Sequence, residues 1–305
     1  MKTALRSLRA FVLLLVLTES AAGLRADGLV IATYNIENYG PANRMTDAGY
    51  RKEYPKPETE KRALHAVLRA LNADVLILQE MGPQPYLDEL QRDLKTAGLD
   101  YPQAVLATAA DADRHVALLS RRPLKAVTTH ADLEFTYFGA KEKVKRGLLE
   151  ATVATAAGDV TLFAVHLKSR FTDRPDDVMS AIRRTGEATA VRDRVLRVFP
   201  APAKARFVIL GDCNDGKGSK PLERLHERGK TVIAELLPAV DSRGESWTHA
   251  FRRDDTYTRV DHILVSPGLI PAVQGGVARI FDGEGVRAAS DHRPVVMTLV
   301  FESKK

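Results

Sequence analysis

The chain has 305 residues, 45% of them apolar, which is enough for one large domain or two small ones. Cys213 is the only cysteine, so no intrachain disulfide can form and the fold must depend on its hydrophobic core. Beyond the N-terminal segment, no stretch reaches the ~18 consecutive apolar residues of a membrane span. The formal net charge of +6 is a mild basic excess that fits a polyanionic substrate without requiring one.

Residues 1–22 have the layout of a secretory signal peptide. Three basic residues precede the apolar run Ala10–Leu17 and the small-residue cleavage site Ser20-Ala21-Ala22. The apolar run is too short to span a bilayer, and the alternative interpretation is a buried N-terminal helix. We therefore expect a signal peptide at 1–22, a single domain at 23–305, and a soluble protein that is secreted or periplasmic and has no stable membrane anchor.

The chain after residue 22 opens with an α/β pattern. The β-branched run Leu29–Asn35 predicts a strand that ends in an amide, and the polar stretch Gly40–Lys56 is interpreted as a loop. A helix with one apolar stripe is expected from Pro57. The nearly all-apolar run Asp74–Glu80 predicts a strand buried on both faces, and a second helix is expected over about Gln84–Ala97. Strand, helix, strand and helix at this spacing indicate a layered α/β fold.

The middle of the chain turns to shorter strands, which are expected at Gln103–Ala107, His115–Ser120, Lys125–Thr129, Gly147–Thr155 and Val160–His166. Residues 134–146 are interpreted as a basic loop. A helix over about Val178–Val198 follows, with Ile182, Thr185, Thr189 and Leu196 expected near one face.

The second half repeats the opening rhythm, with strands expected at Phe207–Asp212, Arg259–Val265 and Pro294–Val300. No linker or repeat divides the chain. We predict one domain in which two β-sheets lie face to face and helices cover them outside.

Polar side chains end several of these apolar strands. Glu80 either binds a metal or caps the next loop. Together with Asn35 and Asp291 it supplies the oxygen ligands that Mg²⁺ or Mn²⁺ prefers, with room left for a substrate phosphate. Five such strand ends, spread along the chain, suggest convergence on one metal-and-phosphate site.

Asp212 and Asn214 leave the same face of a strand end because they are two residues apart. A carboxylate beside an amide can orient an attacking water and donate a hydrogen bond to a phosphoryl oxygen. The alternative is an Asx-turn that closes the loop. Cys213 points away from both residues, so we interpret it as a small buried hydrophobe and not as a nucleophile.

Asp261 lies in the middle of an apolar strand, where a carboxylate is costly unless it is paired. A histidine that an aspartate orients and keeps cationic suits phosphate binding or proton transfer, and His292 is the candidate. His262 points to the other face and is interpreted as structural. His166, Lys168 and Arg170 are spaced two apart and could line one face toward an anion; a solvated strand end is the alternative for the last two.

Together these motifs resemble the endonuclease/exonuclease/phosphatase family, which includes deoxyribonuclease I, apurinic endonucleases, inositol 5-phosphatases and sphingomyelinases. The matching motifs occur in order as the Asn35 strand end, Leu78-Gln79-Glu80, Val116–Arg121, Arg146-Gly147, the His166 strand, Gly211–Asp215, Trp247-Thr248, Arg259–Ser266 and Ser290-Asp291-His292. The His166–Arg170 and Gly211–Asp215 motifs are most similar to the secreted bacterial branch with extracellular nucleases.

The resemblance implies a four-layered α/β/β/α sandwich with two mixed, mostly antiparallel sheets. It also implies hydrolysis of phosphate esters by in-line attack of water, with a divalent metal and no covalent intermediate. Glu80 would be the main metal ligand, with Asn35 beside the metal and Asp291 completing its shell. Asp212 and Asn214 would position water and a phosphoryl oxygen, Asp261 would orient His292 toward the phosphate, and His166 would be a candidate acid toward the leaving oxygen.

Two positions depart from the family pattern. Cys213 stands where the family usually has Phe or Leu, which we expect to be harmless. In nuclease members the histidine that His166 matches has an acidic partner, whereas Arg114 stands near that position here. Asp111 or Asp113 is the expected substitute.

Three functions remain open from the sequence. The first is a nuclease on DNA or RNA, which the basic residues of the 134–146 loop favour and in which Arg146, Lys168 and Arg170 would contact substrate. The second is a phosphatase or phosphodiesterase on a phospholipid or sugar phosphate; the absence of a long aromatic hairpin weakens its sphingomyelinase-like form. The third, a catalytically silent binding module, is disfavoured because every matched residue is present. We expect a monomer with nucleic acid as its substrate.

Overall fold

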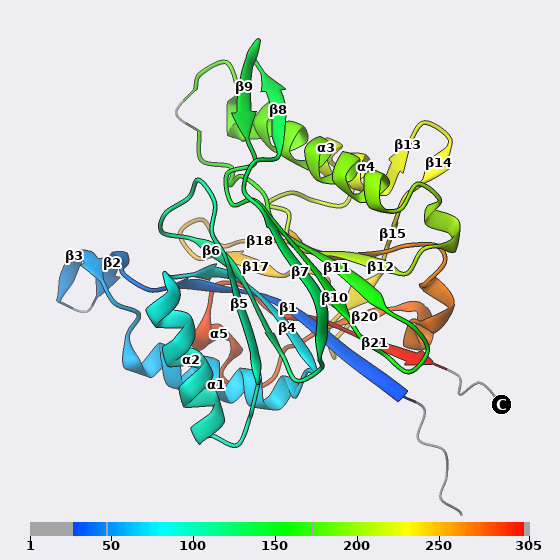
Figure 1. Ribbon diagram of the computed structural model, residues 1–305. Helices are drawn as coiled ribbons and strands as arrows, with labels where there is room; N and C mark the ends of the chain where they lie inside the picture. The colour runs from blue at the N-terminus through cyan, green and yellow to red at the C-terminus, as the bar shows by residue number, and fades with distance from the viewer. Residues whose placement is uncertain (1–26, 47, 173, 302–305) are drawn as a thin grey trace, which may run out of the picture.

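Two large β-sheets lie face to face in the computed structural model, with helices on their outer faces (Figure 1). The structure describes residues 27–46, 48–172 and 174–301, and the predicted signal peptide at 1–22 lies outside them. In this described part of the chain, no helix combines the length and the apolar character needed to cross a bilayer.

The first sheet has seven strands in the order β16-β20-β21-β1-β4-β6-β5. Its strands are β1 (Asp27–Tyr39), β4 (Val75–Met81), β5 (Gln103–Ala107), β6 (His115–Ser120), β16 (Ala239–Val240), β20 (Ala278–Ile280) and β21 (Val295–Phe301). The central strand β1 runs parallel to β4 and antiparallel to β21, so the sheet is mixed.

The second sheet has six strands in the order β15-β19-β12-β11-β10-β7. Its strands are β7 (Leu124–His130), β10 (Leu148–Val153), β11 (Val160–His166), β12 (Phe207–Asp212), β15 (Glu235–Leu236) and β19 (Asp261–Val265). Only β11 and β12 pair in parallel; the other pairs within this sheet are antiparallel.

Alternation along the strands explains the layers. In β1, Leu29 and Ile31 face the second sheet, whereas Ala32 and Tyr34 pack against the outer helices. The first sheet is covered by α1 (Glu58–Leu71), α2 (Gln84–Thr96) and α5 (Val286–Ala289), and the second by α3 (Ala181–Val198) and α4 (Lys220–His226). The predicted four-layered sandwich is therefore confirmed.

Two stretches that we interpreted as loops contain hairpins instead. Residues 40–56 contain β2 (Ala42–Thr46) and β3 (Gly49–Tyr54), and residues 134–146 contain β8 (Glu134–Tyr137) and β9 (Ala140–Lys143). The β2–β3 hairpin carries mostly polar, exposed side chains, so it lacks the apolar alternation of a half-buried strand. In the β8–β9 hairpin the alternation is confined to β8, where Phe135 and Tyr137 are buried between exposed neighbours.

Two strand pairs and four 3₁₀ turns complete the secondary structure of the described residues. Two-stranded pieces join β13 (Glu227–Arg228) to β14 (Thr231–Val232) and β17 (His249–Phe251) to β18 (Thr256–Thr258). Single 3₁₀ turns lie at η1 (Val178–Ser180), η2 (Pro202–Lys204), η3 (Ile270–Ala272) and η4 (Gln274–Gly276).

The face of α3 that carries Ile182, Thr185, Thr189 and Leu196 is not its most buried face. Ile182 is half exposed, and the buried face includes Arg184, Glu187, Ala188 and Val191. Arg184 pairs with Asp215 at 2.8 Å, while Glu187 accepts backbone hydrogen bonds. Distant partners pair with these charged side chains and so allow them to be buried. The spacing of the apolar residues in α3 therefore does not indicate which side of the helix is buried.

Candidate active site

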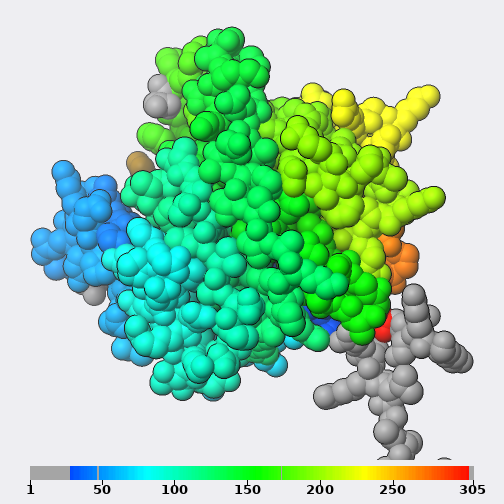
Figure 2. Space-filling model, in the orientation of Figure 1, coloured from blue at the N-terminus to red at the C-terminus, as the bar shows by residue number. Residues whose placement is uncertain are grey.

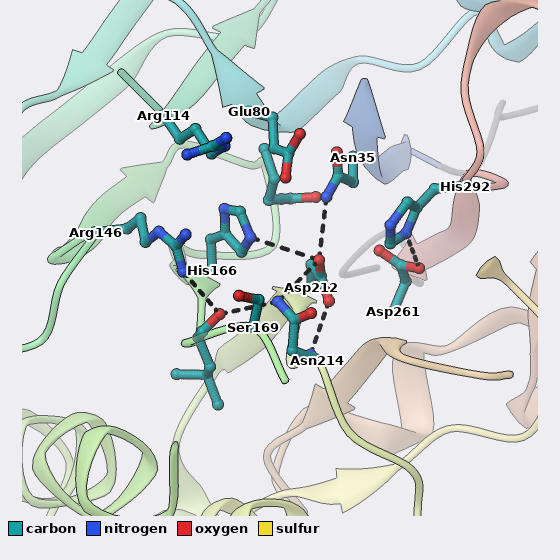
Figure 3. A network of polar contacts seen from close by, with 12 residues as sticks. Asn35, Glu80, Arg114, Arg146, His166, Ser169, Asp212, Asn214, Asp261 and His292 are labelled. Carbon is teal, nitrogen blue, oxygen red and sulfur yellow. Dashed lines mark hydrogen bonds and ion pairs between the residues drawn. The ribbon is translucent and has the colours of Figure 1, made fainter. Parts of the chain in front are cut away.

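The ends of strands from both sheets meet at one cleft of about 670 Å³. Asn35 and Glu80 come from β1 and β4 of the first sheet, and Asp212 comes from the end of β12 in the second (Figure 3). Seven predicted site residues line the cleft: Asn35, Glu80, Arg170, Asp212, Asn214, Asp291 and His292. His166 and Asp261 lie directly behind it, each hydrogen-bonded or paired to a residue that lines it.

Asp212 is the centre of the polar network in Figure 3. Its Oδ2 accepts hydrogen bonds from Asn35 Nδ2 at 3.1 Å and Asn214 Nδ2 at 3.2 Å, and its Oδ1 accepts one from the Asn214 backbone N at 2.7 Å. Burial, followed by the charge of Asp261, raises the pKa of Asp212 to about 6. The carboxylate is therefore a weak base near neutral pH that two amides hold in place.

Gly211 permits the close packing that places Asp212. Its φ is +141°, and a Cβ at this position would lie 2.0 Å from the backbone O of Val165 on β11. Any side chain here would push β12 away from β11 and would separate Asp212 from His166.

His292 and Asp261 form the predicted pair. Nδ1 of His292 lies 2.8 Å from Asp261 Oδ2, and the carboxylate is fully buried. Burial alone would lower the pKa of His292, but the charges of Asp261, Asp291 and Asp212 outweigh it and hold that pKa well above its ordinary value. His292 is thus an imidazolium whose Nδ1–H donates to Asp261.

The turn that carries His292 is tied to both sheets. Ser290 Oγ donates to the backbone O of Asn35 at 2.8 Å and accepts from the backbone N of His292 at 3.0 Å. On the other side, Thr248 Oγ1 accepts from the backbone N of Asp261 at 3.1 Å. These bonds fix the histidine relative to β1 and β19.

The sequence reasoning missed two residues of the cleft, His249 and Glu37. His249 Nε2 lies 3.6 Å from Asp291 Oδ2, and its ring lies 4.5 Å from the His292 ring, centre to centre. Glu37 Oε2 accepts from the backbone N of Asp291 at 3.0 Å. The available signals were the position of His249 directly after Trp247-Thr248 and that of Glu37 two residues after Asn35.

Asp291 remains ionised in this setting. Burial would raise its pKa, but the hydrogen bond from His249 and the charges of His292, His249 and Arg252 lower it to about 2. A carboxylate with so low a pKa offers its oxygens to a cation over the whole physiological range.

Glu80 lies in a sparsely populated backbone conformation, with φ at +63°, where the pairing of β4 shifts register between Gln79 and Met81. Its Oε2 accepts from the backbone N of Asn38 at 3.0 Å, and the side chain lines the cleft. A non-glycine residue at positive φ costs about 1–3 kcal/mol, and such strain is concentrated at functional sites.

The cleft fits a divalent cation by its donor set and its charge. Asn35, Glu80 and Asp291 offer only oxygen ligands, as Mg²⁺, Mn²⁺ and Ca²⁺ require. Burial is the largest cause that raises the pKa values of Asp212 and Glu37, and the second cause is a neighbouring carboxylate, Asp261 or Asp291 respectively. Negative charge is thus concentrated at the cleft.

Two more compact groups contain ligand atoms within 4.8 Å of one another: His249, Asp291 and His292 form one, and Asp212, Asp261 and His292 the other. Both include His292, which is protonated and whose Nδ1 is engaged by Asp261, so neither group as it stands is a ligand set. The oxygen ligands are the better fit.

Neither of the two expected acidic partners of His166, Asp111 and Asp113, pairs with it in the described part of the chain. Its Nδ1 is buried without a hydrogen-bond partner in the described structure, and Asp111 accepts instead from Arg146 Nε at 2.8 Å. Nε2 of His166 lies 3.5 Å from Asp212 Oδ2. Burial, then the charges of Arg146, His292 and Arg114, keep the pKa of His166 well below its ordinary value.

The role of His166 as an acid stays a prediction. The ring is 1% exposed, and burial with the neighbouring cations lowers its pKa, which favours the neutral form. Arg114, which stands where nuclease members have the acidic partner, donates from Nε to Asn38 Oδ1 at 2.9 Å and so supports the loop that holds Glu80.

The three predicted substrate-binding residues lie in three different places. Arg170 lines the cleft, and its Nε donates to the backbone O of Asn214 at 3.3 Å. Arg146 is buried and engages Asp111 and the backbone O of Leu167. Lys168 faces a second hollow beside the cleft.

The two residues interpreted as structural lie away from the cleft. Cys213 is buried in the core between α3, α4 and the second sheet, and burial raises the pKa of its thiol well above the ordinary value. His262 is buried, and its Nε2 is 2.8 Å from the backbone O of Asp215.

Comparison with known proteins identifies one family and several similar folds. The model of the Endonuclease/Exonuclease/phosphatase family matches residues 32–292. A search of curated proteins found no match.

Three solved structures illustrate the likeness. Sphingomyelinase C from Streptomyces griseocarneus is 18% identical, with 89% of this chain and 99% of that chain covered and a TM-score of 0.61. The human Nocturnin catalytic domain with bound sulfate is 16% identical, with 90% and 95% covered and a TM-score of 0.63. Truncated TDP2 from Caenorhabditis elegans is 14% identical, with 90% and 98% covered and a TM-score of 0.58. At these identities the likeness concerns the fold.

Proposed function

Because the chain belongs to the endonuclease/exonuclease/phosphatase family, whose members hydrolyse phosphoric esters with divalent metal ions, we propose that it is an exported endonuclease acting on DNA or RNA. The observation that carries the chemistry is the cleft in which cationic His292 and the oxygen ligands Asn35, Glu80 and Asp291 surround Asp212. A phosphodiester entering this cleft meets positive charge, a metal-binding edge and a base.

Asp212 orients and deprotonates the attacking water. Its carboxylate is ionised above about pH 6 and is held by Asn35 and Asn214, so it can accept one proton as the water oxygen bonds to phosphorus. The bond from phosphorus to the leaving oxygen breaks on the opposite side, in line with the attack.

His292 stabilises the charge that develops on the phosphoryl oxygens. With Nδ1–H committed to Asp261, Nε2–H is the donor available to the phosphate, and a charged donor forms a stronger hydrogen bond than a neutral one. A divalent cation held by Asn35, Glu80 and Asp291 would neutralise the phosphate and the leaving oxygen. Neutral His166 helps to hold Asp212 from behind.

A second candidate function is a phosphodiesterase on phospholipids, and one observation favours it. The rim of the cleft carries exposed apolar side chains, with Phe171 79%, Met179 47% and Phe251 45% exposed. Exposed aromatic side chains stack on the bases of nucleic acids, but they also enter the interfacial layer of membranes.

An activity panel tests the proposal. The protein lacking residues 1–22 is assayed with Mg²⁺ or Mn²⁺ on plasmid DNA, single-stranded DNA, RNA, phosphomonoesters and phospholipid vesicles. Asp212→Ala tests the site, and Asp100→Ala, at an exposed carboxylate after α2, is the matched control.

We expect cleavage of nucleic acid by the native and control proteins and not by Asp212→Ala. Turnover confined to lipids or small phosphates would replace the nuclease by the second candidate. No turnover of any substrate in the panel with either metal would overturn the proposal that the protein is a hydrolase.

A further inference from the structure

A second hollow of about 470 Å³ lies beside the active-site cleft and is lined by cations. Its lining consists of Lys141, Lys143, Lys145, Lys168 and Arg183, together with Glu142 and Ala110. We propose that this basic hollow binds the phosphodiester backbone of the nucleic-acid substrate at a phosphate other than the one being cleaved. The inference rests on the proposed nuclease function and extends it to how the substrate strand is held.

The fold builds this hollow from three segments. The β8–β9 hairpin projects beside α3 at the upper edge of the molecule, as Figures 1 and 2 show. Lys141 and Lys143 are two residues apart on β9, so they share one face of the hairpin. Lys168 follows β11, and Arg183 lies in the first turn of α3.

One buried carboxylate ties these segments together. Glu187 of α3 is fully buried, and its two oxygens accept from the backbone N of Lys145 at 3.1 Å and of Lys168 at 2.7 Å. The backbones that carry two of the lysines are thereby fixed relative to α3. The hollow is therefore held by the fold and does not arise from side chains on separate loops.

The hollow carries more positive charge than its own carboxylate neutralises. Glu142 is the one carboxylate among the described lining residues, and it pairs with Arg183 at 3.1 Å. Asp111 lies 3.9 Å from Lys145, but its closer partner is Arg146 at 2.8 Å. Glu134 is opposite Lys143 in the hairpin register and is the remaining acidic neighbour on β8.

The lowered pKa of Lys168 agrees with this surplus of positive charge. Its Nζ donates to backbone oxygens of Ser169 and Phe171. Burial, followed by the charges of Arg146 and Lys145, lowers the pKa of Lys168 to about 8. A phosphate bound in the hollow would relieve this repulsion and add a charged hydrogen-bond acceptor.

The hollow and the cleft are adjacent, so one polymer can bind in both. Lys168 lines the hollow, whereas the next three residues, Ser169, Arg170 and Phe171, line the cleft. A molecule with one phosphate can occupy one of the two spaces only. A strand with a phosphate at every nucleotide can occupy both at once, and each cationic contact adds sequence-independent affinity.

Charge and composition favour nucleic acid over a lipid surface. Among the described lining residues of the hollow, no apolar side chain is larger than Ala110, and the apolar rim residues Phe171 and Met179 belong to the cleft. Docking on a membrane would combine basic with large apolar side chains on the same patch.

The test compares two double variants of equal charge change. Lys141→Ser/Lys143→Ser removes two exposed lysines of the hollow. Lys204→Ser/Lys230→Ser is the control, at exposed lysines in η2, which precedes the start of β12, and in the β13–β14 turn. Binding of a fluorescein-labelled oligothymidylate is measured in EDTA over a range of salt, and kcat/KM with Mg²⁺ or Mn²⁺ is measured on that oligomer and on the dinucleotide TpT.

We expect the hollow variant to bind the oligomer about 10-fold more weakly and to lose about 1.4 from the slope of log K against log salt, 0.7 for each phosphate contact. The ratio of kcat/KM on the oligomer to that on TpT should fall by a similar factor. The control variant should match the native protein in both measurements, and thermal unfolding verifies that all three proteins are folded.

Failure of the inference and failure of the proposed function give different results. If the native protein cuts the oligomer and the hollow variant binds and cuts it as the control does, the inference is overturned and the nuclease stands. If the native protein cuts no nucleic acid, the nuclease fails; weaker oligomer binding by the hollow variant alone would still support the hollow. If oligomer binding is absent and anionic phosphatidylglycerol vesicles are bound through these lysines, the hollow is a lipid-headgroup site and the inference is overturned.

Discussion

His166 and His292 flank Asp212 in the same site, yet one favours the neutral form and the other the cationic form (Figure 3). His292 has the carboxylate of Asp261 at 2.8 Å and two further carboxylates near it, so it keeps its proton. His166 is fully buried beside Arg146 and Arg114, and its Nδ1 has no hydrogen-bond partner among the described residues, so its pKa is lowered and the neutral form is favoured. The comparison teaches that the neighbours of a buried imidazole, and not its residue type, decide whether it binds phosphate or merely supports a carboxylate.

The largest expected effect comes from removing the negative charge of Asp261, which keeps His292 protonated. Asp261→Asn keeps the shape of the side chain but should lower the pKa of His292 and reduce kcat/KM on a phosphodiester by about 10³-fold. The measurement is steady-state kinetics, with NMR of the His292 ring to follow its pKa. Asp100→Asn serves as the control. A loss smaller than about 10-fold would show that the cation at His292 is dispensable.

The second effect concerns Asp212, which lies between the two histidines. Its pKa is raised to about 6 from 3.8, so the folded state holds the proton more tightly than the unfolded state does. As pH rises from about 4 to 6, this carboxylate therefore lowers stability, and the penalty is complete above pH 6.

Asp212→Asn removes that penalty. Without divalent cations, the gain in stability of the variant over the native protein should be larger at pH 8 than at pH 4, by about 2.5 kcal/mol. Urea unfolding in EDTA at the two pH values measures this difference. Equal effects of the substitution at pH 4 and pH 8 would contradict the raised pKa.

A smaller effect is expected at the neutral histidine. His166→Gln keeps an N–H donor near Asp212 Oδ2, so kcat/KM should fall by about 10-fold or less, with little change in the pH profile. His292→Gln, measured beside it, should lose about 10³-fold. Equal losses in the two variants, with loss of the basic limb of the pH profile in His166→Gln, would restore the role of His166 as an acid.

The smallest effect tests Arg114, the residue that stands where nuclease members have a carboxylate. Arg114→Gln removes a positive charge near His166, so the pKa of His166 should rise when followed by NMR. Since glutamine can still donate to Asn38, we expect kcat/KM to change by only about 2-fold to 3-fold. Arg121→Gln, at the other end of β6, is the matched control; an unmoved His166 pKa would remove Arg114 from the explanation.

Local sequence pattern was enough to predict β1, β4, α1 and α2. Their apolar residues recur at the spacing of a buried strand or of one helix face, and burial of those residues needs no knowledge of distant partners. The pairing of Asp261 with His292 was also predictable, because a carboxylate inside an apolar strand requires a partner. The same applies to Asp212 and Asn214, whose common face follows from their spacing.

The β2–β3 hairpin escaped prediction because its strands pair mostly polar, exposed residues. The β8–β9 hairpin escaped because the burial of Phe135 and Tyr137 depends on Ala190 of α3, which is remote in sequence. The buried face of α3 escaped because Arg184 and Glu187 are satisfied by Asp215 and by backbone groups far away in the chain. The contribution of His249 escaped because its contact with Asp291 joins β17 to a turn that is remote in sequence.

The sequence by itself therefore determined the family, the layered fold and the residues that surround Asp212, since these follow from local periodicity and from the chemistry of short motifs. Only the tertiary structure decided the charge of His166, the partner of Asp111 and the direction of Lys168. Each of these depends on which side chains the packing of two sheets and the β8–β9 hairpin bring within a few ångströms, and electrostatic energy depends on that distance and on burial, not on separation along the chain.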